Sequence, residues 1–278
     1  MIEQTTQDIQ WFQFHLFKDI PNLSHGVFSR IGGASSAPYH TLNTASSIGE
    51  NLEAVTENRR RVQQILQCKD PLTTIKSEHA KHAYEVTHEN RYKTVCPTPQ
   101  EISFGDILLT VTPGAGLFWS VADCAPIFFY DPAHHALALT HAGWRGTAKG
   151  AAIATITEMR SRYSSNINEL LVGIGPCIGA CCYEVGENVR QEFQRDKLLF
   201  ETASFTEHFV TDPAGNSHTS LRFDVAQTNK NQLLAMGIPE DHIELSGMCT
   251  GCRTDLFYSY RVEKGKTGRF AAAAALRA

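Results

Sequence analysis

The chain has 278 residues, of which 42% are hydrophobic and 19% are charged, and its formal net charge is −4. This composition is typical of a globular protein with a sizeable core, and the length allows one large domain or two small ones. The slightly negative charge does not favour a nucleic acid or an anionic membrane as a partner. No run approaches the roughly 18 apolar residues of a membrane span, and the first residues lack the features of a signal peptide. We therefore expect a cytoplasmic protein whose eight cysteines stay reduced.

Apolar runs bounded by turn residues predict the strands. The first is expected at 25–30, and a loop rich in Gly and Ser follows at 31–38. The other predicted strands lie at 84–87, 107–111, 117–122, 127–130, 136–139, 170–174 and 242–245.

Three segments have the apolar spacing of helices. The first spans 52–67, and the second is expected to begin near Gly146. The third spans 225–236, with Asp224 as its N-cap and Gly237 at its end. Strands and helices alternate only in part, and one hairpin is clear. This favours a mixed α/β or α+β sandwich over a purely parallel sheet.

Cys124 and His141 stand at the two ends of the predicted hairpin. Its strands are the apolar runs 127–130 and 136–139. A hairpin centred on Ala133 pairs residues whose numbers sum to about 266, which places Ala125 opposite His141 and Cys124 beside it. Cross-strand neighbours lie about 5–8 Å apart, so a thiol and an imidazole should meet at one end of the hairpin.

This pair has three interpretations. Cysteine with histidine suits a transition metal such as zinc, and a catalytic zinc takes three protein ligands. The third ligand would be His79, or its competitor His82, both of which lie between a predicted helix and a predicted strand. Alternatively, Cys124 is a nucleophile and His141 is its base. In the third interpretation both side chains are only parts of a packed core.

The remaining cysteines and histidines give weaker signals. Cys249 and Cys252 have the C-x-x-C spacing of a zinc knuckle, and Cys177 with the pair at 181–182 could complete a four-cysteine site. The chain has no second C-x-x-C, which argues against such a site. The adjacent histidines at 134–135 fall at the predicted turn tip, where solvation is the simplest explanation.

Two glycines, Gly143 and Gly146, flank the expected helix start after His141. The N-terminus of a helix exposes unpaired N–H groups and the positive end of the helix dipole, and both favour anions. A phosphate or a substrate oxyanion could therefore bind there, although a plain strand-to-helix turn would use the same glycines.

The run His141-Ala142-Gly143-Trp144-Arg145-Gly146 is the most specific of many motifs that occur in a fixed order. The others lie at 28–33, 42–43, 57–59, 105–106, 110, 122–126, 175–179, 182–185, 223–224, 249–250, 257–261 and 267–269. Together they resemble the YfiH-type laccase-domain family, also called the multicopper polyphenol oxidase family or a purine nucleoside phosphorylase family. The resemblance covers nearly the whole chain.

The resemblance implies a single YfiH-like domain over residues 1–278, folded as a four-layer αββα sandwich with mixed sheets. It also implies a catalytic zinc held by His79, Cys124 and His141. The implied reactions are phosphorolysis of adenosine, inosine or methylthioadenosine, and deamination of adenosine. Arg30 and Asn43 match family positions near the site.

Two departures from the family pattern concern acidic residues. The family usually has Gln-Val before the first histidine, where this chain has Ser77-Glu78 before His79. It also tends to have Gly-Asp after the Leu-Asn element, where this chain has Gly49-Glu50. The carboxylate of Glu78 either alters the field at the site or points to solvent.

The main hypothesis is a zinc-dependent enzyme that acts on purine nucleosides and phosphate. In phosphorolysis, phosphate would attack the ribose anomeric carbon while Arg30, Arg145 and the N–H groups from Gly143 onward bind it. In deamination, hydroxide generated by the zinc would attack the purine C6.

The main alternative is a cysteine hydrolase or amidase with Cys124 as its nucleophile. It draws on the link between proteins of this resemblance and peptidoglycan precursor editing. A copper polyphenol oxidase, or laccase, needs many histidines in adjacent pairs, and only the residues at 134–135 form one. A non-catalytic metal-binding module would instead close its fourth coordination position with a protein side chain.

Overall fold

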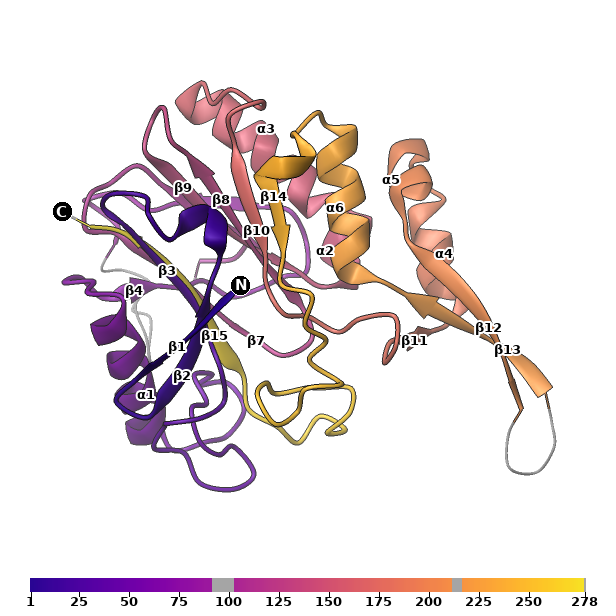
Figure 1. The fold of residues 1–278 in the computed structure, drawn as a ribbon, viewed down its shortest axis with the longest axis horizontal. Helices are drawn as coiled ribbons and strands as arrows, with labels where there is room; N and C mark the ends of the chain where they lie inside the picture. Colours follow the sequence, from indigo (N-terminus) through magenta and orange to yellow (C-terminus); the bar gives the residue numbers. More distant parts are fainter. Residues whose placement is uncertain (92–102, 212–216, 278) are drawn as a thin grey trace.

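The computed structural model describes residues 1–91, 103–211 and 217–277. Two six-stranded mixed sheets stack face to face, and helices cover the outer face of each (Figure 1). This is the expected αββα arrangement of four layers. No helix within the described ranges is both long and apolar enough to cross a membrane.

The first sheet combines both ends of the chain. Its strand order is β1-β2-β3-β15-β7-β4, and only the β4–β7 pair is parallel. The strands are β1 (Ile2–Thr6), β2 (Ile9–Gln13), β3 (Leu23–Phe28), β4 (Leu72–Thr73), β7 (Gly116–Val121) and β15 (Phe270–Leu276).

The second sheet has the order β14-β10-β8-β9-β6-β5, with parallel pairs at its two edges. Its strands are β5 (Ala83–Glu85), β6 (Ile107–Thr110), β8 (Ala125–Asp131), β9 (Ala136–Ala142), β10 (Leu171–Ile174) and β14 (Ile243–Leu245). A small third sheet extends to one side (Figure 1) and is built from β11 (Glu184–Val185), β12 (Phe205–Thr211) and β13 (Ser217–Phe223).

Helices complete the outer layers. The first sheet is covered by α1 (Leu52–Ile65), and the second by α2 (Trp144–Ala148), α3 (Ala151–Tyr163) and α6 (Val225–Ala235). Beside the small sheet lie α4 (Glu187–Phe193) and α5 (Lys197–Thr202) (Figure 1). Two short 3₁₀ turns are η1 (His15–Phe17) and η2 (Glu240–His242).

Three apolar cores separate the four layers, because successive strand residues point to opposite faces of a sheet. On β8, Phe128 packs between the two sheets, whereas Phe129 packs against the helices of the outer layer. On β15, Ala272 faces the second sheet and Ala273 faces α1. The small alanine side chains allow close packing on both faces of this central strand.

The sequence analysis predicted most of these elements. The helix expected at 52–67 is α1, and Asp224 caps α6 by accepting a hydrogen bond from the Gln227 N–H at 2.8 Å. The helix expected from Gly146 is instead two helices, α2 and α3. The break falls at Gly150, whose φ of 74° is left-handed and does not continue a helix.

The hairpin register differs by one residue from the expected register. Pro126, not Ala125, lies opposite His141, because the β8–β9 ladder closes at Asp131 and Ala136 around a four-residue loop. Several strands and helices were not predicted: β1, β2, β4, β11, β12, β13, β15, α4 and α5. The alanine run of β15 has a strong intrinsic preference for helix, and only its central place in the sheet makes it a strand.

The core between the second sheet and the helices gives a stability prediction. Phe129→Ala should lower the free energy of unfolding by about 3–5 kcal/mol, because the buried ring leaves a cavity. Phe209→Ala is the matched control, since that ring is 78% exposed, and its effect should stay within about 0.5 kcal/mol. Urea unfolding of both variants measures the difference, and equal midpoints would contradict the assigned packing.

Candidate metal centre

The β8–β9 hairpin brings Cys124 and His141 to one end of the space between the sheets. His141 lies on β9 with the same alternation as Leu137 and Leu139, so its ring points between the sheets. Cys124 directly precedes β8, and the register continues to place it opposite Gly143. Asp123 has a φ of 78°, a left-handed conformation that changes the direction of the backbone just before Cys124.

His79 reaches this point from the loop between β4 and β5. Its own φ is 52°, which is again left-handed. The buried carboxylate of Asp106 accepts backbone N–H bonds from Glu78 at 3.2 Å, His79 at 3.2 Å and Ala80 at 2.7 Å. Lys149 donates from Nζ to the His79 carbonyl at 2.9 Å. The loop is therefore held by hydrogen bonds on both sides of the histidine.

The side-chain donor atoms of His79, Cys124 and His141 all lie within 4.8 Å of one another. The two imidazole rings meet edge to face, with centroids 5.2 Å apart. His141 is buried, whereas His79 and Cys124 are partly exposed. A thiolate and two imidazoles are a donor set that suits zinc or copper, and three protein donors leave room for a water or a substrate. The cluster can therefore hold a metal ion.

Asp106 also orients the His141 ring. Nδ1 of His141 donates to Asp106 Oδ1 at 2.9 Å, which leaves Nε2 as the second ring nitrogen. Ser77 Oγ donates to the same carboxylate oxygen at 2.5 Å. Burial alone would raise the pKa of Asp106, but the bonds from His141, Ser77 and Ala80 hold it well below its usual range. A carboxylate behind a histidine is the usual outer contact of a metal-binding imidazole.

The cysteine and the histidine stabilise each other's charged forms. Burial would raise the pKa of Cys124, but the charge of His141 and hydrogen bonds from His141 and His79 lower it to about 6. Burial would lower the pKa of His141, but the Cys124 thiolate and Asp106 raise it well above its ordinary value. A low thiol pKa serves both metal binding and nucleophilic attack.

Arg30 was expected to contact the substrate, and its guanidinium is already engaged within the fold. It forms an ion pair with Glu263 at 3.0 Å and donates to the carbonyls of Thr254 at 2.8 Å and His40 at 3.2 Å. It also lies over the Tyr258 ring, 4.4 Å from the centroid. These contacts join the loop after β3 to the loop before β15.

Asn43, a second expected substrate contact, is fully buried. Its Oδ1 accepts from the Arg269 N–H at 2.7 Å and from the Ala45 N–H at 3.2 Å. Its Nδ2 donates to the Ala45 carbonyl at 3.1 Å and to the carboxylate of Glu50. Glu50 is the acidic residue that replaces the usual Asp of the family pattern, and it serves here as the acceptor for Asn43.

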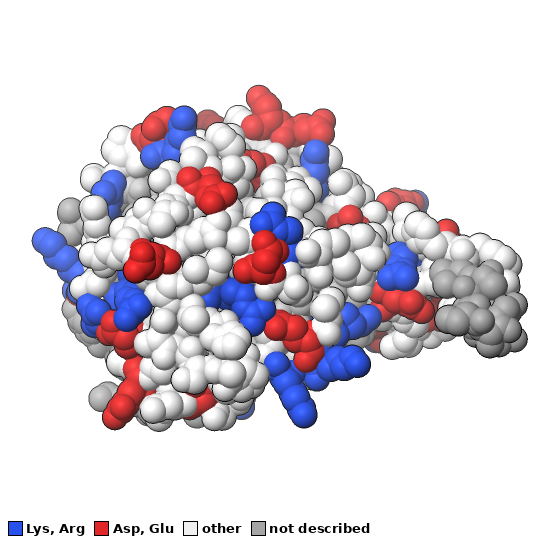
Figure 2. Space-filling model, turned by 60° about the horizontal axis from the view of Figure 1, so that its bottom comes forward, with Lys and Arg blue, Asp and Glu red and all other residues white. Residues whose placement is uncertain are grey.

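Gly143 lies next to the cluster, and Arg145 follows it in α2. Gly143 is the N-cap of α2, and a Cβ added to it would stand only 2.7 Å from Cys124 Sγ. Arg145 is exposed, with its guanidinium 4.3 Å from the centroid of the Trp144 ring. Figure 2 shows basic and acidic side chains interspersed over one face of the molecule, with neither sign dominating.

The structure also distinguishes His79 from His82, which the sequence left as competing candidates for the third ligand. His82 lies outside the cluster, and its Nδ1 is 3.1 Å from the carboxylate of Glu78. Glu78, which departs from the family pattern, is therefore paired with the exposed side chain of His82. Asp106 and Ser77 were not predicted as site residues. The signals available for Asp106 were its position directly before a buried strand and its place in the family motif at 105–106.

A family described as multi-copper polyphenol oxidoreductase laccase matches residues 24–277 of the chain. The chain belongs to this family. The match agrees with the resemblance seen in the sequence motifs.

Relatives and solved structures are similar to this chain in both sequence and fold. The purine nucleoside phosphorylase YlmD of Geobacillus stearothermophilus is 32% identical over 89% of this chain and 88% of its own length. A purine nucleoside phosphorylase of Bacteroides thetaiotaomicron is 30% identical over 95% of each chain. The crystal structure of the Bacillus licheniformis protein YfiH superposes with a TM-score of 0.84, at 30% identity and 98% and 97% coverage of the two chains.

The copper chemistry in the family's description requires donors that this member does not bring together. Within the described ranges, the only groups of three or more metal-type side chains are the His79 cluster and a set of four cysteines. The adjacent pair His134 and His135 lies at the opposite end of the β8–β9 hairpin, where it contacts Asp131 and Tyr130. Neither group is a multi-histidine copper site.

The thiolate of this laccase-family site gives a pH prediction. In chelator-treated protein, the rate of Cys124 alkylation should rise through a midpoint near pH 6 and then level off, because the pKa is lowered to about 6. Cys68 is the internal control, since burial raises its pKa to about 11. Peptide mapping after iodoacetamide pulses at stepped pH measures both thiols. A Cys124 midpoint near the ordinary value of about 8.5 would contradict the ion pair.

Proposed function

We propose that this protein is a zinc-dependent enzyme acting on purine nucleosides, with His79, Cys124 and His141 as the zinc ligands. The convergence of these three donors within 4.8 Å supports the proposal. Two relatives named purine nucleoside phosphorylase also match along 88% and 95% of their own lengths. Similarity over whole chains favours a shared activity more than a shared fold alone would.

The donor set fits zinc on chemical grounds. Two imidazoles and a thiolate of low pKa are suitable ligands for a borderline-soft cation, and the ion would displace the proton that Cys124 and Asp106 otherwise hold on His141. The Asp106 carboxylate fixes the Nδ1 proton of His141, so that the lone pair of Nε2 is free to coordinate. Zinc bound here would supply a Lewis acid that polarises an oxygen atom or acidifies a water molecule near neutral pH.

The reactions we propose are phosphorolysis of adenosine, inosine or methylthioadenosine, and deamination of adenosine. Phosphorolysis forms a bond between a phosphate oxygen and the ribose anomeric carbon while the bond to the purine nitrogen breaks. Arg145 would hold the phosphate, because its side chain is exposed and it follows Gly143 by two residues. Arg30 and Asn43 would act by fixing the loops around the substrate, since their polar atoms already have partners.

A cysteine hydrolase is the second candidate, and one observation favours it. Cys124, His141 and Asp106 stand in the order nucleophile, base and orienting carboxylate. Cysteine proteases arrange a nucleophile, a base and an orienting residue in the same order. The two candidates differ in the state of the thiol. A free nucleophile is alkylated at once by iodoacetamide, whereas a metal-bound thiolate reacts only after a chelator removes the ion.

Incubation of the zinc-loaded protein with adenosine, with and without phosphate, tests the proposed activity. We expect adenine to form only with phosphate, and inosine to form without it. Cys124→Ala should lower both rates on the order of a thousand-fold, because a metal contributes several kcal/mol to the transition state. Cys68→Ala is the matched control. A zinc-loaded protein that converts no purine nucleoside would overturn the proposal.

The steric fit at Gly143 gives a second prediction. Gly143→Ala should weaken zinc binding by about 10–100-fold, because the new Cβ would stand 2.7 Å from Cys124 Sγ and displace it. Gly146→Ala is the control on the same helix, where the nearest atom would be 3.5 Å from the new Cβ. Zinc competition with a chromophoric chelator measures both affinities. Equal affinities would show that Cys124 is not a ligand.

A further inference from the structure

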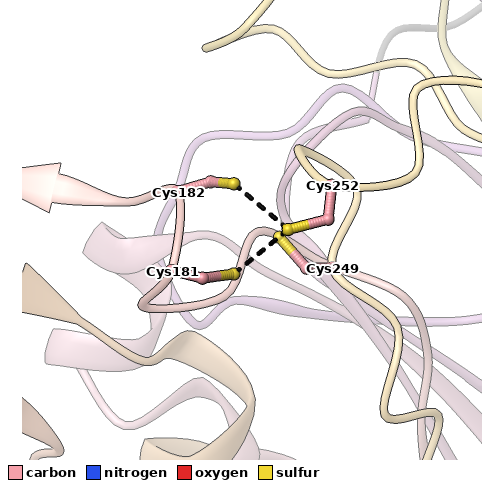
Figure 3. A group of neighbouring side chains, drawn as sticks. All are labelled: Cys181, Cys182, Cys249 and Cys252. Carbon is pink, nitrogen blue, oxygen red and sulfur yellow. Dashed lines mark hydrogen bonds between the residues drawn. The ribbon is translucent and has the colours of Figure 1, made fainter.

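A second cluster of soft donors lies outside the His79 site. Cys181 and Cys182 follow β10 in one loop, and Cys249 and Cys252 follow β14 in another. All four Sγ atoms lie within 4.8 Å of one another. Figure 3 shows the two pairs pointing toward each other from the two loops. Roughly seventy residues separate the pairs in the chain, so only the fold brings them together.

Backbone contacts hold the two loops in this position. Cys177 and Cys249 form an isolated parallel bridge, and the Thr250 N–H donates to the Cys177 carbonyl at 3.0 Å. The Gly179 N–H donates to Cys249 Sγ at 3.2 Å. An N–H bond to sulfur stabilises a thiolate and is a common outer contact of a metal-bound cysteine. The sulfur atoms are therefore placed by the backbone and not by flexible side chains alone.

The arrangement of the sulfurs favours one centre over two separate pairs. Cys252 Sγ lies 3.4 Å from Cys181 Sγ and also 3.4 Å from Cys182 Sγ. One sulfur thus contacts two others, which a single disulfide cannot satisfy. Tetrahedral zinc with Zn–S bonds of about 2.3 Å would place its sulfurs about 3.8 Å apart. The two separations at Cys252 are about 0.4 Å shorter than that value, and all four sulfurs lie within 4.8 Å of one another.

We propose that Cys181, Cys182, Cys249 and Cys252 bind a second zinc ion, in a closed tetrahedral site with a structural role. Four thiolates fill the coordination shell, so no position is left for a substrate. Each thiol that is protonated beforehand releases its proton when the ion binds. Cys177, which the sequence offered as a candidate for a four-cysteine site, is buried in the core and lies outside the cluster.

The second site would brace the first. Three contacts hold Asp123, the residue before Cys124. Thr250 Oγ1 donates to its Oδ1 at 2.6 Å, and the Arg261 N–H donates to its Oδ2 at 2.7 Å. The Ile178 N–H donates to the Asp123 carbonyl at 3.0 Å. Ile178 and Thr250 belong to the two loops that the four cysteines join, so a metal there would fix the backbone next to Cys124.

Metal content of the full chain, purified under reducing conditions and loaded with zinc, tests this proposal. Wild type should hold two zinc ions per chain, and Cys252→Ser and Cys181→Ser should each hold one. Both positions are exposed, so these substitutions spare the core. Cys68→Ala, outside both clusters, is the control and should keep two. Cys124→Ala should lose only the ion of the His79 site.

X-ray absorption of the zinc left in Cys124→Ala identifies its ligands. Four sulfur neighbours at about 2.3 Å are expected. A Cys124→Ala protein without zinc, or with nitrogen ligands on its zinc, would overturn the four-cysteine site, as would disulfides among these residues in reduced preparations. Failure of the His79 zinc site leaves a different result, because Cys124→Ala would then retain all the zinc of the wild type, and failure of the nucleoside activity alone would leave every zinc content unchanged.

Discussion

The carboxylate of Asp106 is the interaction on which the site depends. It is fully buried at the start of β6, where it accepts three backbone N–H bonds from the His79 loop and the Nδ1 proton of His141. An unpaired buried carboxylate would be costly, so each of these donors is held firmly. One side chain therefore fixes a loop, a ring orientation and a charge. Without this carboxylate, the His79 loop would lose the three backbone hydrogen bonds that hold it close to β9.

The four-layer architecture explains why the site forms at one end of the sheets. Side chains fill the space between the sheets with apolar packing, and His141 continues the inward row of Leu137 and Leu139 on β9. At the strand ends this packing gives way to polar side chains from loops, where a metal can be approached. The hairpin itself sets the position of Cys124, because its register is fixed by the short turn at the other end.

The loops after β10 and β14 form the other wall of the site. They contact each other through the Cys177–Cys249 bridge and the four clustered cysteines, and both donate hydrogen bonds to Asp123. A closed metal centre and an open one would then stand side by side, with different tasks. The closed centre would join the loops after β10 and β14, and the open one would carry the chemistry.

Elements with local signals could be predicted from the amino-acid sequence alone. Near-helical spacing marked α1, a capping aspartate marked α6, and a turn between apolar runs marked the hairpin that carries Cys124 and His141. The ordered motifs also indicated the family and its αββα layers. These features depend on residues close together in the chain, where periodicity and turn chemistry act directly.

Which distant residues share a site became known only from the folded structure. It separated His79 from His82, gave Asp106 its role, and placed Cys181 in a cluster that excludes Cys177. It also made a strand of the alanine run in β15, against its helical preference. The physical reason is the same in each case. Sheet pairing and core packing act between segments far apart in sequence, and no local pattern records which partner a segment will meet.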